Sequence, residues 1–126
     1  MTPILAFDIE TVPDVNGIRL LYDLPASLPD DEVVLFAQQK RRAQNGSDFM
    51  QHHLHQVVAI SCCMRWGQDK IHVGTIGEMH DSEEEMIAKF FDLIESHTPQ
   101  LVSWNGGGFD LPVLHYRALI HGIAAA

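Results

Sequence analysis

Positively charged residues are scarce in this chain. Its 126 residues include 8 Lys and Arg against 17 Asp and Glu, a formal net charge of −9. Non-specific affinity for nucleic acid comes from Lys and Arg that neutralise phosphates, so this balance argues against a protein that binds nucleic acid through bulk charge. It leaves open an enzyme that meets phosphates through metal ions held by carboxylates.

Long apolar runs and spaced cysteines are also missing. No stretch approaches the roughly 20 consecutive apolar residues that a membrane span needs, and the N-terminus lacks the basic start of a signal peptide. The two cysteines, Cys62 and Cys63, are adjacent and would point to opposite faces of a strand. We therefore expect no structural disulfide, no membrane partner, a cytoplasmic location and one soluble domain over residues 1–126.

Hydrophobic spacing predicts an α/β fold with a mixed sheet. The last helix is expected to turn Leu111, Leu114, Ala118 and Ile120 toward that sheet. Ser82 and Glu85 form a capping box at the start of another helix. In chain order we expect strands at 2–10, 56–66, 70–76 and 101–104, helices at 30–44, after Ser82 and at 111–121, and an irregular connection at 11–29.

The first candidate site is the pair Asp8 and Glu10. Residues i and i+2 of a strand share a face, so both carboxylates would project together while Leu5, Phe7 and Ile9 pack on the other side. Two further Asp-x-Glu pairs occur at predicted helix starts, where acids favour the helix dipole. Only Asp8 and Glu10 lie in an apolar strand, where carboxylates could flank divalent cations. The alternative is a strand end that has reached solvent.

The second candidate is the loop from Asn105 to Asp110, which holds three consecutive glycines between a strand and a helix. Glycines permit a strained turn and the close approach of a substrate, and such loops at strand ends bind ligands in open α/β sheets. Phe109 could pack against a base and Asp110 could reach a metal. Alternatively, Asp110 caps the helix and Phe109 belongs to the core.

Two other features permit a functional and a plain interpretation. Arg117 lies about two helical turns after Asp110, where it could contact a phosphate or simply face solvent. His52, His53 and His55 have a spacing that suggests zinc, but no fourth ligand of conventional spacing follows. We therefore expect these histidines to lie in a solvated loop, with a zinc-binding protein as a remaining alternative.

These motifs together resemble the 3′→5′ exonucleases of the DEDD superfamily, and most of all the proofreading-exonuclease-like domain related to family B DNA polymerases. The first motif of that family matches Phe7-Asp8-Ile9-Glu10-Thr11, and the second matches the stretch from Asn105 to Arg117. The resemblance covers essentially the whole chain. It implies a ribonuclease-H-like sheet flanked by helices.

The resemblance also implies roles for individual residues. Asp8, Glu10 and Asp110 would be catalytic carboxylates and ligands of two divalent cations, Mg²⁺ or Mn²⁺. Asn105 and Phe109 would contact the terminal nucleotides of a single-stranded 3′ end, and Thr11 and Arg117 would be further substrate contacts. The activity implied is release of nucleoside monophosphates from that end.

The chain ends 16 residues after Asp110 and shows no match to the family's third motif, with its fourth carboxylate. We therefore expect the last strand and helix of the fold to be missing, and the uncovered apolar face to promote self-association. A module that keeps the fold and binds nucleic acid without cleaving it is the alternative function.

Overall fold

The computed structural model describes residues 2–104 and 106–124 and divides the chain into two compact units. Residues 1–11 and 57–126 form the sheet unit, and residues 12–56 form the helical unit. The elements are strands β1 (Ile4–Pro13), β2 (His55–Trp66), β3 (Lys70–Thr75) and β4 (Gln100–Val102), helices α1 (Val15–Tyr22), α2 (Asp30–Asn45), α3 (Glu83–His97) and α4 (Leu111–His121), a 3₁₀ turn (His52–Leu54) and a π-helical turn (Gly106–Asp110).

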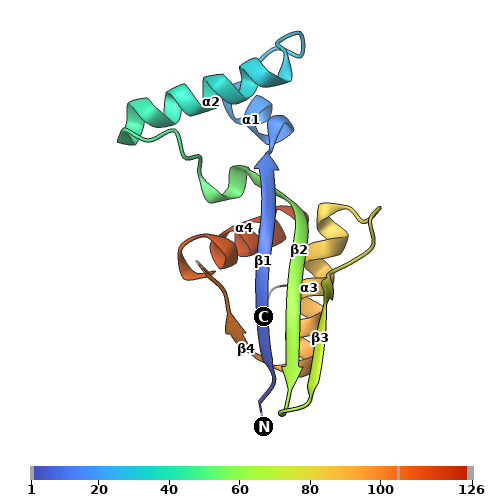
Figure 1. Ribbon diagram of the computed structural model, residues 1–126. Coiled ribbons are helices and arrows are strands. Elements are labelled where there is room, and N and C mark those ends of the chain that lie inside the picture. Colours follow the sequence, from blue (N-terminus) through green and yellow to red (C-terminus); the bar gives the residue numbers. More distant parts are fainter. Residues whose placement is uncertain (1, 105, 125–126) are drawn as a thin grey trace. The chain divides into compact units, whose positions relative to one another are not determined.

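The sheet has the strand order β3-β2-β1-β4 and is mixed, as the sequence predicts. β1 and β4 are parallel, with Leu5 opposite Leu101 and Ala6 opposite Val102. β2 and β3 form an antiparallel hairpin, in which Cys63 lies opposite Val73. Figure 1 shows β1 and β2 side by side and running in opposite directions.

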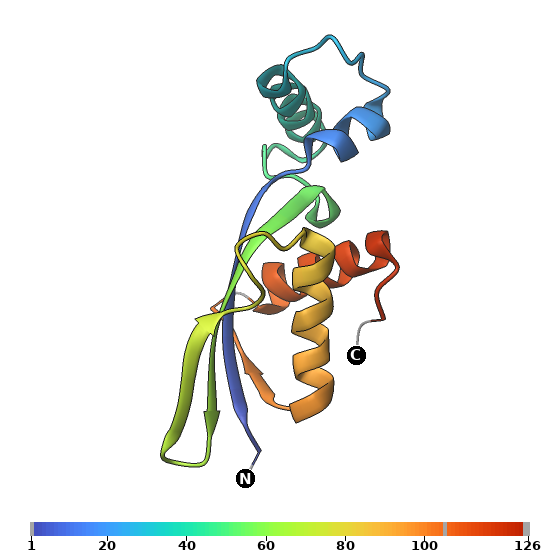
Figure 2. The ribbon, with the colours of Figure 1, turned by 90° about the vertical axis from the view of Figure 1, so that its right-hand side faces the viewer.

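The core of the sheet unit lies between the sheet and two helices. α3 and α4 lie on the same side of the sheet (Figure 2). Alternate residues of β1, Leu5, Phe7 and Ile9, are buried on that side, and the ring of Phe7 lies 5.1 Å from that of Phe90 on α3. Because strand side chains alternate between faces, the intervening residues of β1 are directed away from this core.

The helix α3 begins where the capping box predicts. The Ser82 hydroxyl accepts a hydrogen bond from the Glu85 N–H at 3.2 Å and also contacts the Glu85 carboxylate. α4 also keeps its predicted bounds, but its buried face differs in one position from the prediction. Val113 is fully buried, whereas Ile120 is 54% exposed, so the prediction that Ile120 faces the sheet was wrong.

The helical unit corrects the prediction that residues 11–29 are irregular, because Val15–Tyr22 form α1. Asp14 precedes this helix and its carboxylate accepts a hydrogen bond from the Gly17 N–H at 3.1 Å. A Cβ at position 17 would lie 2.6 Å from an Asp14 oxygen, so a larger residue there would displace the carboxylate that caps the helix. The Asn16-Gly17 pair therefore belongs to a first helical turn instead of a loop.

A second small core holds the helical unit together. It consists of the buried side chains Ile18, Val33, Ala37, Met50 and Leu54. In the part of the chain that the structure describes, no helix is long and apolar enough to cross a membrane.

Candidate active site

Two carboxylates of β1 are exposed on the face of the sheet opposite to the core. Asp8 and Glu10 alternate with the buried Phe7 and Ile9, so the prediction that the two acids share a face is confirmed. Within residues 2–104 and 106–124 neither carboxylate has a hydrogen-bond or ion-pair partner. Their four oxygen atoms therefore remain available to an external ligand.

An open depression lies on the same face of the sheet and includes Asp8 in its lining. Its volume is about 550 Å³, and residues from β1, β2 and β3 contribute to it, among them Ala6, Ser61, Cys63 and Thr75. The depression is wide and solvent-accessible. A chain-like ligand could therefore reach Asp8 from outside the molecule.

Asp110, the third predicted carboxylate, has a different environment. It is only 5% exposed and lies at the end of the π-helical turn, directly before α4. The Ser103 hydroxyl, one residue after β4, donates a hydrogen bond to Asp110 Oδ2 at 3.0 Å. Asp110 occupies the N-cap position of α4, but its side chain makes no capping hydrogen bond. Ser103 therefore orients this buried carboxylate.

The predicted substrate contacts lie in several environments. Thr11 is half-buried near the end of β1. Phe109 is half-buried and packs against the core of the sheet unit, as the plainer interpretation of the loop predicts. Asn105 lies outside the described residues. Its predicted contact with a terminal nucleotide therefore stays a prediction.

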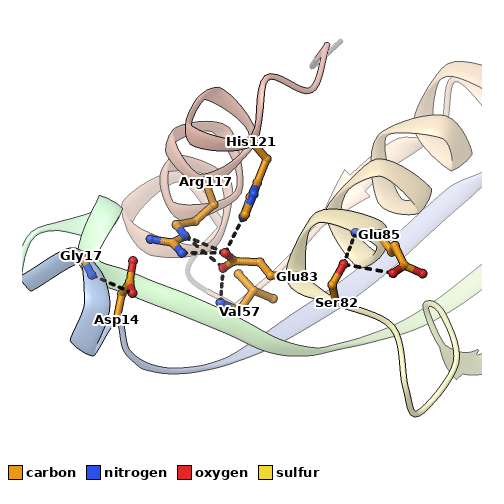
Figure 3. Close-up of polar contacts among 8 residues, drawn as sticks. All are labelled: Asp14, Gly17, Val57, Ser82, Glu83, Glu85, Arg117 and His121. Atoms are coloured by element: carbon orange, nitrogen blue, oxygen red, sulfur yellow. Dashed lines mark hydrogen bonds and ion pairs between the residues drawn. The ribbon is translucent and has the colours of Figure 1, made fainter. Parts of the chain in front are cut away.

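Arg117 is buried, so the interpretation that its side chain simply faces solvent was wrong. It is 4% exposed, and its guanidinium is paired with the carboxylate of Glu83 at the start of α3 (Figure 3). Arg117 Nη2 donates to Glu83 Oε1 at 2.6 Å, and Nε lies 3.0 Å from both Glu83 oxygens. Phosphate binding by this guanidinium would have to compete with a buried ion pair.

Glu83 joins three elements of the sheet unit. Besides Arg117, it accepts a hydrogen bond from the Val57 N–H of β2 at 2.5 Å, and His121 Nε2 at the end of α4 lies 2.7 Å from Oε1 (Figure 3). A buried carboxylate is tolerated because these donors replace water. Glu83 therefore ties α3 and α4 to β2, in the same unit as Asp110.

Sequence reasoning missed Glu83. Asp81 and Glu83 form one of the two Asp-x-Glu pairs predicted at helix starts, and nothing in the sequence separates Glu83 from the exposed Glu84 and Glu85 beside it. The sequence of α4 did contain a signal of this buried carboxylate. Arg117 and His121 are four residues apart on one face of α4, which indicates a shared anion.

The described residues do not supply a complete metal site. Among residues 2–104 and 106–124, no group of three or more His, Cys, Asp or Glu side chains is placed to hold a metal ion. This finding covers Asp8, Glu10 and Asp110, and it also covers the histidine cluster. His55 instead contacts the Met50 carbonyl at 3.2 Å and the ring of Phe49, which gives zinc binding no support.

The donor chemistry nevertheless suits a hard cation at one place. Asp8 and Glu10 offer only oxygen ligands, which favour Mg²⁺ or Mn²⁺ over zinc. Both are unpartnered among the described residues, whereas Asp110 is engaged by Ser103. Asp8 and Glu10 therefore suit a divalent cation, but the described residues do not group Asp110 with them.

Comparison with solved structures identifies the class of fold. A family B DNA polymerase from the hyperthermophilic archaeon Pyrobaculum calidifontis is similar with a TM-score of 0.52 and 22% sequence identity. The match covers 98% of this chain and 12% of that polymerase. At this identity the likeness concerns the fold alone, and it confirms the predicted α/β class with a mixed sheet.

Sequence comparison narrows the assignment. The family described as "Predicted 3'-5' exonuclease related to the exonuclease domain of PolB" matches residues 47–126, and the chain belongs to this family. The matched segment includes Asp110 and the glycine loop, whereas Asp8 and Glu10 lie before it. The resemblance to a proofreading-exonuclease-like domain is thereby confirmed.

Two archaeal proteins named DNA polymerase 1 share short segments with the chain. The protein from Sulfolobus acidocaldarius is 40% identical over 42 residues, which are 33% of this chain. The protein from Sulfurisphaera ohwakuensis is 46% identical over 44 residues, or 35% of this chain. In each case the match spans 5% of the relative's length.

Proposed function

We propose that this chain is a 3′→5′ exonuclease domain that hydrolyses single-stranded nucleic acid from its 3′ end and releases nucleoside monophosphates. The observation that carries the proposal is the pair Asp8 and Glu10: exposed, unpartnered among the described residues, and on one face of β1 beside an open depression. Membership in a family of exonuclease-related domains supports the reaction class.

Asp8, Glu10 and Asp110 are the residues that would hold divalent cations, Mg²⁺ or Mn²⁺. Two exposed carboxylates on one strand face repel each other, and a cation between them relieves that repulsion. When bound there, such cations would lower the pKa of a coordinated water and stabilise the leaving 3′ oxygen. Among the described residues, Asp110 is not grouped with the β1 pair.

The chain's own residues would prepare this chemistry in distinct ways. Asp8 and Glu10 supply the negative charge that attracts cations to the open face. Ser103 holds the Asp110 carboxylate in one orientation through its hydroxyl. Arg117 and Glu83 fix α4, whose first turn follows Asp110, against α3 and β2. A structural tie suits Arg117 better than the phosphate contact expected from the motif, because its guanidinium is buried.

The proposal is tested by incubating the chain with end-labelled single-stranded DNA or RNA and Mn²⁺. We expect stepwise loss of mononucleotides from the 3′ end, no cleavage after chelation of the metal, and at least a 100-fold slower reaction in Asp8→Ala, on the order of the losses that follow removal of a catalytic group. Glu84→Gln is the matched control, because this acid is exposed on α3. Equal cleavage by Asp8→Ala would contradict the proposal.

A nucleic-acid-binding module without hydrolysis is the second candidate. It is favoured by the absence of an assembled three-carboxylate group among the described residues. The same assay distinguishes it: Mn²⁺-dependent binding of a 3′ end without release of mononucleotides would support this function in place of the enzyme.

A further inference from the structure

Trp104 is a large apolar side chain with no cover. It is fully exposed, at 102% of the reference surface, and its indole makes no ring contact or hydrogen bond with the residues that the structure describes. Tryptophan side chains are on average highly buried in folded proteins. The whole ring of Trp104 is therefore accessible to a ligand.

The position of Trp104 connects it to the proposed active site. It directly follows Ser103, whose hydroxyl holds Asp110, and it precedes the glycine loop. The neighbouring aromatic residue of that loop, Phe109, is half-buried and packs against the core. Of these two rings, only that of Trp104 offers an open face to a ligand.

The charge of the sheet unit makes such a ring important for binding. This unit carries eleven Asp and Glu against four Lys and Arg, a net charge of −7, and one of its cations is the buried Arg117. A polyanion is repelled by this balance, so in the absence of bound cations its attraction must come largely from contacts that do not depend on charge. Stacking of bases on aromatic rings provides such a contact and tolerates any sequence.

We propose that Trp104 stacks on the base at the 3′ end of a single-stranded nucleic acid and holds that end beside Asp110. The inference rests on the proposed function, because it takes the 3′ end as the substrate. It assigns a binding role to a residue that the motif comparison leaves without one. DNA and RNA share this chemistry, since both present the same flat bases.

The experiment uses the chain's own fluorescence. Trp66 is half-buried against the core, 5.8 Å from the ring of His97, and Trp66→Phe leaves Trp104 as the single tryptophan. A short single-stranded oligonucleotide is titrated into this variant in the presence of a chelator, which removes metal-dependent binding and cleavage. Parallel titrations use DNA, RNA, and DNA with an abasic 3′-terminal nucleotide.

We expect saturable quenching by oligonucleotides with an intact terminal base and little change between low and moderate salt. The abasic oligonucleotide should quench weakly. Trp104→Leu, which keeps apolar surface but removes the flat ring, should raise the dissociation constant about 5- to 150-fold in an anisotropy measurement. Trp104→Phe should lose less. Equal quenching of DNA and RNA assigns the contact to the base, and quenching by one alone restricts the proposal to that nucleic acid.

Three results would overturn the inference: no quenching, equal quenching by the abasic oligonucleotide, or unchanged affinity in Trp104→Leu. Its failure is separable from that of the proposed function. Metal-dependent cleavage that depends on Asp8 but is unaffected by Trp104→Leu would overturn only the stacking. Quenching with an intact terminal base, without any cleavage, would uphold the stacking and contradict the enzyme.

Discussion

Two Asp-x-Glu pairs of the sheet unit show how one sequence pattern acquires opposite roles. Asp8 and Glu10 lie on a strand face, exposed and without partners among the described residues. In the second pair Asp81 is bound by Lys89, and Glu83 is buried among donors from β2 and α4. The carboxylates of the first pair are available to an external ligand, whereas those of the second pair are bonded to other residues of the chain. Spacing alone does not reveal this difference.

The largest effect on stability is expected from breaking the buried ion pair between Glu83 and Arg117. Arg117→Met should lower the free energy of unfolding by about 3–5 kcal/mol, because Glu83 would remain buried with its charge uncompensated. Chemical denaturation measures this loss. The double variant Glu83→Gln/Arg117→Met should recover much of it, since the unpaired charge is then gone. A single variant as stable as the unchanged protein would show that Glu83 relaxes into solvent.

A smaller effect is expected at the hydroxyl that holds Asp110. Ser103→Ala should cost about 1–3 kcal/mol of stability, because a buried carboxylate loses its hydrogen-bond donor. Ser103→Thr retains the hydroxyl and serves as the control in the same denaturation experiment. If the Ser103→Ala and Ser103→Thr variants have the same free energy of unfolding, the Ser103–Asp110 hydrogen bond does not stabilise the fold.

Substitution of Asp8 or Glu10, the exposed pair on β1, should have little effect on stability. Asp8→Asn and Glu10→Gln should change the free energy of unfolding by no more than about 0.5 kcal/mol, as exposed substitutions usually do. Calorimetric titration with Mn²⁺ should nevertheless show binding in the unchanged protein and its loss in Asp8→Asn. A strongly destabilised Asp8→Asn variant would contradict the interpretation of this pair as functional.

The smallest effect concerns Asp81 and its dependence on pH. The hydrogen bond from Lys89 lowers the pKa of the Asp81 carboxyl below its ordinary value of 3.8. The pKa of Asp81 is thus lower in the folded state than in the unfolded state. The stabilisation of the fold by this carboxylate is therefore fully present above pH 3.8, and it decreases as pH falls through the lowered pKa.

The expected difference in Tm between the unchanged protein and Asp81→Asn is therefore small near neutral pH and smaller still in acid. Thermal unfolding over the acidic range measures it. Asp92→Asn, an exposed acid on α3, is the control and should show no such pH-dependent difference. A difference that grows toward acid would have the wrong sign for a lowered pKa.

Much of the sheet unit follows from sequence because its signals are local. Alternation of apolar residues predicts β1 and the shared face of Asp8 and Glu10. The capping box at Ser82 predicts the start of α3, and Pro112 in the first turn agrees with the start of α4. These features depend on residues within a few positions of one another, so no tertiary contact is needed to foresee them.

The helical unit shows where local signals mislead. Asn16-Gly17 is typical of a turn, but Gly17 packs against Asp14 inside the first turn of α1. Leu35 in α2 is 52% exposed although its sequence neighbours are apolar. Propensity cannot decide such positions, since the outcome depends on which side of a helix meets the small core.

The sequence by itself determined the α/β class, the mixed sheet, and the two carboxylates on one face of β1. The tertiary structure alone decided that Glu83 is buried, that Arg117 pairs with it 34 positions away in sequence, and that Trp104 is left uncovered. Strand alternation and helix capping are properties of neighbouring residues. Burial and ion pairing depend on elements far apart in the chain, which meet only when the core forms.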